Sequence, residues 1–113
     1  MTDLPTINQL PRELLLDAHS IAAFERHTEG AAPVTAVEAL DAHGVVLART
    51  IIRGAGDREA AAEQALAGSG LERCGEYRVD PLRDRTRVVA LVTLRVSNTI
   101  SDFQARRIAA DLS

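Results

Sequence analysis

The sequence has few of the residues that usually reveal the chemistry of a small protein. Among its 113 residues there are no tryptophans or lysines, three aromatic residues and one cysteine. The single Cys74 cannot form an intrachain disulfide or hold a metal ion alone, which favours a reducing, cytoplasmic setting. Neither a signal-peptide pattern nor an apolar run of membrane-spanning length is present, so we expect no membrane segment.

Strong charge of one sign is also missing. The formal net charge is −3 and the isoelectric point is near 5.5, which makes nucleic acid an unlikely partner. A length of 113 residues indicates one domain, residues 1–113, and 46% hydrophobic residues can build its core without disulfides. With so few aromatics, that core has to consist of aliphatic residues and alanine.

The most regular pattern is the stretch from Thr86 to Val96, in which apolar residues alternate with others. Period-two alternation of this length predicts a long strand that is buried on one side. The expected buried face consists of Val88, Ala90, Val92, Leu94 and Val96. The expected outer face carries Arg87, Val89, Leu91, Thr93 and Arg95.

The rest of the chain divides into short segments. Residues 1–10 look like an extended arm. Residues 11–27 follow helical spacing through Leu14, Ala18 and Ile21, with Pro11 in the first turn. Strands at 34–40 and 45–53 flank an Asp-Ala-His-Gly turn and predict a hairpin. Asp57 is a suitable N-cap for a helix over residues 58–67. A strand over 76–82 precedes the long strand, and capping-box spacing predicts a final helix over 101–112.

This order predicts an α+β domain. It consists of an N-terminal helix followed by a ββα-ββα unit over residues 34–112. The four strands form a mostly antiparallel sheet with the helices packed on one face.

Catalytic and metal-binding signals are weak. The histidines lack the spacing of paired metal ligands, and no carboxylate pair implies an acid and a base in one cleft. The glycine-rich loop before Asp57 lacks the further residues of a phosphate-binding motif. We therefore predict no catalytic residues, metal or cofactor, and expect a protein that is not an enzyme. One alternative is a small-ligand pocket, or a minor enzyme, between helix and sheet near His43, Cys74 and Tyr77.

The outer sheet face is the strongest candidate for function. Apolar side chains flanked by arginines are typical of interaction surfaces. Coverage of this face by the N-terminal helix is the structural alternative, and weak nucleic-acid contact through its arginines is a third possibility. The candidate interface residues are Leu47, Arg49, Ile51, Arg53, Arg87, Val89, Leu91 and Arg95.

Two family resemblances are visible in this pattern. The segment from Thr50 to Val96, ending VVALVTLRV, resembles dodecin-type flavin-binding folds, but there is no tryptophan to stack on a flavin. The segment from Val37 to Leu66 (VEALDAHGVVLARTIIRGAGDREAAAEQAL) is similar to the strand-strand-helix part of double-stranded-RNA-binding domains. Asp57 and Glu59 stand where those domains have a basic helix start, so no family residue is carried over.

The sequence thus favours a small protein-binding or assembly domain. We expect a homodimer, built through the sheet face or the edge of a long strand, that acts as an accessory or regulatory protein. Its partner is itself or another protein.

Overall fold

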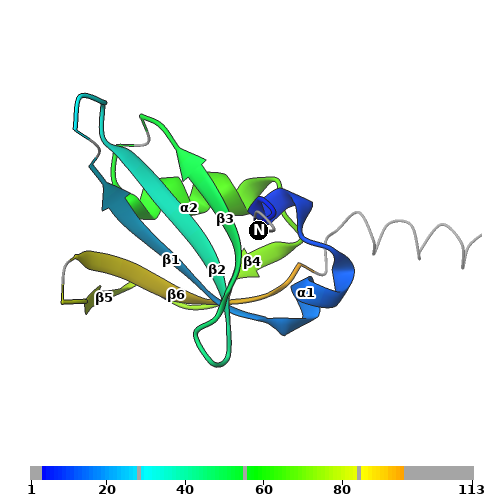
Figure 1. The fold of residues 1–113 in the computed structure, drawn as a ribbon. Coiled ribbons are helices and arrows are strands. Elements are labelled where there is room, and N and C mark those ends of the chain that lie inside the picture. The colour runs from blue at the N-terminus through cyan, green and yellow to red at the C-terminus, as the bar shows by residue number, and fades with distance from the viewer. Residues whose placement is uncertain (1–3, 28, 55, 84, 96–113) are drawn as a thin grey trace, which may run out of the picture.

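The computed structural model describes residues 4–27, 29–54, 56–83 and 85–95. In this part of the chain, six antiparallel strands form one curled sheet, in the order β3-β2-β1-β6-β4, with β5 also paired to β6 (Figure 1). The strands are β1 (Ala18–Arg26), β2 (Val34–Asp41), β3 (Val46–Ile52), β4 (Leu71–Arg73), β5 (Arg78–Pro81) and β6 (Thr86–Leu94). The helical elements are a 3-10 turn η1 (Ile7–Gln9), α1 (Arg12–Asp17) and α2 (Arg58–Ala67).

The predicted α+β architecture with four strands is wrong, chiefly because the helix expected over residues 11–27 does not form. Only α1 is helical, and the chain continues as β1. The run Ile21-Ala-Ala-Phe24 is buried throughout because β1 is a central strand with side chains buried on both faces. A strand of this kind has a continuous apolar run and no alternation, and such a run also fits helical spacing.

Other expected elements are confirmed. The hairpin of β2 and β3, helix α2 and the strand β6 all lie within two residues of their predicted bounds where the structure describes them. Asp57 caps α2, since its carboxylate accepts a hydrogen bond from the Ala60 N–H at 2.7 Å. The strand expected over 76–82 forms as β5, although it is shorter, and β4 is an additional short strand that the sequence did not predict. The predicted final helix over 101–112 lies outside the described residues.

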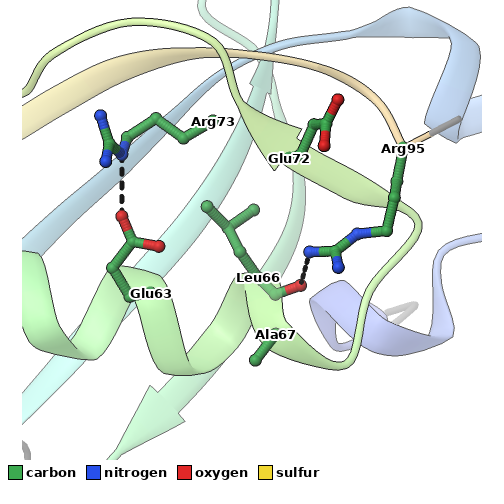
Figure 2. A pocket seen from close by; sticks show the side chains of 6 residues that line it. All are labelled: Glu63, Leu66, Ala67, Glu72, Arg73 and Arg95. Carbon is green, nitrogen blue, oxygen red and sulfur yellow. Dashed lines mark hydrogen bonds and ion pairs between the residues drawn. The ribbon is translucent and has the colours of Figure 1, made fainter. Parts of the chain in front are cut away.

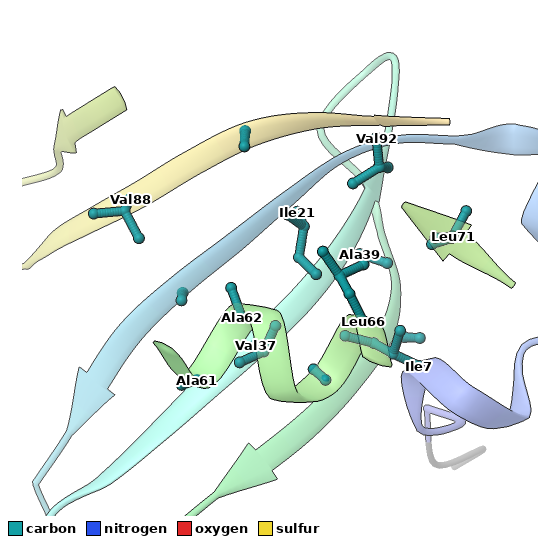
Figure 3. Packing of buried hydrophobic residues seen from close by; sticks show 14 of the residues in the cluster. Ile7, Ile21, Val37, Ala39, Ala61, Ala62, Leu66, Leu71, Val88 and Val92 are labelled. Atoms are coloured by element: carbon teal, nitrogen blue, oxygen red, sulfur yellow. The ribbon is translucent and has the colours of Figure 1, made fainter. Parts of the chain in front are cut away.

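Helix α2 packs across one face of the sheet, which we call the inner face, and β1, β2, β3, β4 and β6 all contact it. Alanines line the helix side of this contact, and small residues let the helix backbone lie close to the strands (Figure 3). From β6 the inner face receives Val88, Ala90 and Val92, all buried as predicted, but Leu94, which was also predicted to be buried, is 38% exposed. Val96 lies outside the described residues.

The arm that precedes α1 is part of the core. We use "N-terminal arm" for residues 4–10. Its Ile7 is 1% exposed and packs in the same cluster as Leu66 of α2 (Figure 3). Leu10 is also buried there. The arm therefore closes the end of the space between α2 and β3, and it does not cover the opposite sheet face.

Candidate functional site

The face of the sheet opposite α2, here called the outer face, carries no helix or strand from the described part of the chain (Figure 1). Strand register assigns its side chains, because paired residues of antiparallel strands point to the same side. The outer face consists of Ser20, Ala22 and Phe24 of β1; Ala36, Glu38 and Leu40 of β2; Arg49 and Ile51 of β3; Arg87, Val89 and Leu91 of β6; and Arg78 and Asp80 of β5.

The middle of the outer face is built around a buried ion pair. Glu38 is 6% exposed, although it lies on a face that no described element covers. Its carboxylate accepts a hydrogen bond of 2.8 Å from Nε of Arg49, its cross-strand partner on β3. The side chain of Arg49 is 39% exposed, so the carboxylate of this pair is buried while the guanidinium contacts solvent. Ala22 and Ala36 beside it are fully buried, so the residues next to the ion pair have short side chains.

A second ion pair lies at the β5 side of the outer face. Nε of Arg87 donates a hydrogen bond of 2.7 Å to the Asp80 carboxylate, and these residues are again cross-strand partners. Between them, the two pairs neutralise two of the arginines that the sequence suggested for nucleic-acid contact. This removes support from that third possibility, because phosphate binding needs cationic charge that is not already neutralised.

Exposed apolar side chains lie on either side of this central ion pair. Leu91 is 43% exposed and Ile51 is 41% exposed, on opposite sides of the two central strands. Val89, two residues before Leu91 on the same face of β6, lines a hollow of about 290 Å3 together with Arg78, Val79 and Asp80. Three of these four lining residues belong to the outer face. A protruding leucine thus lies beside a recess on the same surface.

Five of the eight predicted interface residues share this face. They are Arg49, Ile51, Arg87, Val89 and Leu91. Leu47 does not, because the register of β2 and β3 shifts there and leaves it as the extra residue of a bulge, packed against the core. Arg53 lies beyond the end of β3. Arg95 lies beyond β6, and its guanidinium donates to the carbonyls of Leu66 and Leu71.

The three predicted pocket residues are not brought together. His43 lies in the turn between β2 and β3, whereas Cys74 and Tyr77 lie between β4 and β5. None of these three residues lines the hollow beside Val89 or the pocket between α2 and β4. Tyr77 packs against the core, and its hydroxyl donates to Glu63 of α2. Burial and the neighbouring Glu63 carboxylate raise the pKa of Tyr77.

The turn that holds His43 has a structural role. Oδ1 of Asp41 accepts hydrogen bonds from the backbone N–H groups of His43 and Val45, and Gly44 has φ of +82°. These bonds, above all that from Val45, hold the pKa of Asp41 below its usual value. The predicted hairpin turn is confirmed, with Asp41 opening it and glycine supplying the positive φ.

The pocket in Figure 2 lies between the C-terminal half of α2 and β4. It has a volume of about 410 Å3 and is lined by Glu63, Leu66, Ala67, Glu72, Arg73 and Arg95. Arg73 pairs with Glu63 at 2.8 Å, which raises the pKa of the guanidinium. The Arg95 guanidinium donates to the Leu66 carbonyl near the C-terminus of α2, a favourable place for a cation. In Figure 2 the two guanidiniums lie on either side of Leu66 and do not converge on a common point.

Two further ligand signals are absent from the described part of the chain. It contains no group of three or more His, Cys, Asp and Glu side chains that could hold a metal ion. At the start of α2, the Asp57 carboxylate occupies the position that a bound phosphate would need. The glycine-rich loop therefore acts here as a loop-to-helix connection.

Sequence reasoning missed several members of the outer face. Phe24 was assigned to a helix, but it lies on β1 with the Arg85 guanidinium 4.4 Å from its ring centre. The alternation over 76–82 predicts that Arg78 and Asp80 share one side of their strand, but it does not show that this side belongs to the outer face. The spacing of Asp80 and Arg87 across a charged turn was the available signal, because it is the spacing of cross-strand partners in a hairpin.

Comparison with known proteins identified no family: no family model matches the chain, and no curated protein or solved structure shows significant similarity to it. Neither resemblance noted in the sequence gains support from these comparisons. Among the described residues, no helix is long and apolar enough to cross a membrane.

Proposed function

We propose that this domain is a protein-assembly module that pairs with a second copy of itself through the outer face. The observation that carries the proposal is the exposed Leu91 beside a hollow on the same surface. In a two-fold symmetric dimer each copy presents the same patch, so a knob and a hole on one surface can engage twice.

The charge arrangement of the outer face supports a second copy as the partner. Glu38–Arg49 and Asp80–Arg87 are ion pairs within one chain. Two identical surfaces usually repel when they carry like charges, but internally paired charges reduce that repulsion.

The sheet edges favour the face over an edge as the contact. The strand β6 is not an edge, because β4 and β5 pair with it. The strand β5 has four residues and ends at Pro81, which cannot donate to a neighbouring strand. The edge strand β4 has only three residues. The edge on the opposite side of the sheet, β3, is partly covered by the N-terminal arm. An accessory or regulatory role in a reducing, cytoplasmic compartment agrees with this proposal and with the exposed Cys74.

The test compares two charge substitutions by light scattering. Leu91→Asp places a carboxylate within the proposed contact. Leu16→Asp is the matched control, since Leu16 lies on α1 and is 63% exposed. We expect the unmodified protein and the Leu16→Asp variant to have the mass of a dimer at about 100 µM, and Leu91→Asp to have that of a monomer. An unmodified protein that is monomeric there, or a dimeric Leu91→Asp variant, contradicts the proposal.

A further inference from the structure

The strand β3 is a long sheet edge that the N-terminal arm covers only in part. Edge strands present unpaired backbone groups that can bind another chain. The Arg49 N–H points away from β2 and donates to the Pro5 carbonyl at 2.9 Å. The backbone groups of Ile51, two residues further on, point the same way. None of the described residues bonds to them across the edge.

The arm is attached to this edge by few interactions. Besides the Pro5 carbonyl, the Ile7 N–H donates to Oγ1 of Thr50 at 2.9 Å. Pro5 has no N–H, so it accepts a bond from β3 without donating one in return. The buried side chain of Ile7 supplies the main anchor. A hollow of about 320 Å3 lies between arm, β3 and α2, lined by residues that include Thr6, Thr50 and Gln64.

We infer that the N-terminal arm blocks the edge of β3 and so prevents it from pairing with the β3 strand of a second copy. When the arm is displaced, the backbone of Arg49 joins that of Ile51 as one open edge. The same edge on a second copy is complementary to it, because antiparallel strands related by a two-fold axis exchange equivalent backbone bonds. The Arg49 side chains then approach each other with their charge already paired to Glu38.

This inference is independent of the outer-face dimer, so its test is done with Leu91→Asp present in every chain. Ile7→Asp removes the anchor by placing a charge in the core. Gln9→Asp is the matched control, because it adds the same charge to the same turn at an exposed position. The measurements are molecular mass by light scattering and amide hydrogen exchange at Arg49 and Ile51.

We expect the Ile7→Asp chain to form a dimer in which the Ile51 amide becomes protected. The Gln9→Asp chain should stay monomeric with an unprotected Ile51 amide. A folded Ile7→Asp chain that remains monomeric overturns the inference.

A milder variant decides the question if Ile7→Asp fails to fold. Thr50→Val keeps the shape of the side chain and removes only the oxygen that accepts from Ile7. We expect the Arg49 amide to exchange about tenfold faster, because opening of the arm becomes easier, and the dimer fraction to rise. Unchanged exchange at Arg49 overturns the inference.

Discussion

The two faces of one sheet are built by different rules. On the inner face, alanines and aliphatic residues pack against α2, and buried side chains such as Val88 and Val92 are apolar and need no hydrogen-bond partner. On the outer face, small residues lie between two ion pairs, and apolar side chains project into solvent. The inner face thus accounts for folding. The outer face has features that folding alone does not require, and for this reason our proposed contact with a second copy lies there.

The difference between the two faces is tested most strongly by substituting two adjacent residues of β6 that point to opposite faces. Val92 is 6% exposed on the inner face, whereas Leu91 is 43% exposed on the outer face. Val92→Asp buries an unpaired carboxylate and should lower the free energy of unfolding by about 4 kcal/mol or more. Leu91→Asp should change it by no more than about 1 kcal/mol in the monomer.

Urea unfolding followed by circular dichroism measures both values. The comparison of the dissociated monomers is the relevant one, since any dimer adds its own stability. Equal losses for the two variants would show that the outer face is also part of the core.

A smaller effect is expected from the ion pair at the centre of the outer face. Glu38→Gln keeps the size of the side chain and leaves Arg49 without its charged partner. Removing one member of a buried pair costs about 3 to 5 kcal/mol, but Arg49 is 39% exposed, and water then solvates its guanidinium. We therefore expect a loss of about 1 to 2 kcal/mol, measured by the same unfolding experiment.

The control for that prediction is Asp80→Asn, since Asp80 is more exposed than Glu38. It should cost less, because exposed ion pairs contribute about 0 to 1 kcal/mol. A larger loss for Asp80→Asn than for Glu38→Gln would reverse the ranking of the two pairs.

Local signals in the sequence were sufficient for part of the fold. The alternation in β6, the turn chemistry of Asp41 and Gly44, and the cap at Asp57 each depend on residues close in the chain, and all three are confirmed. The predicted hairpin also places Glu38 and Arg49 on neighbouring strands, but the burial of Glu38 depends on the whole sheet.

The remainder depended on contacts between distant segments. The run at Ile21 is a strand because β2 and β6 pair with it on both sides. A helix over the same residues would need neither strand as a partner. The burial of Ile7 depends on α2, more than fifty residues further along the chain. Leu47 is displaced from the outer face by a bulge, and no local residue pattern predicted this bulge.

The central claim is that Leu91 of one copy enters the hollow of another, and a disulfide between chains tests it most directly. With Cys74→Ser in every chain, protein carrying Leu91→Cys is mixed with protein carrying Arg78→Cys and oxidised. Each chain then has one cysteine, so a disulfide joining positions 91 and 78 has to link two chains. It also requires Cα atoms within about 7 Å. The account predicts this linked dimer in high yield, identified by peptide mass spectrometry. A yield no greater than that from Leu16→Cys mixed with Arg78→Cys would contradict it.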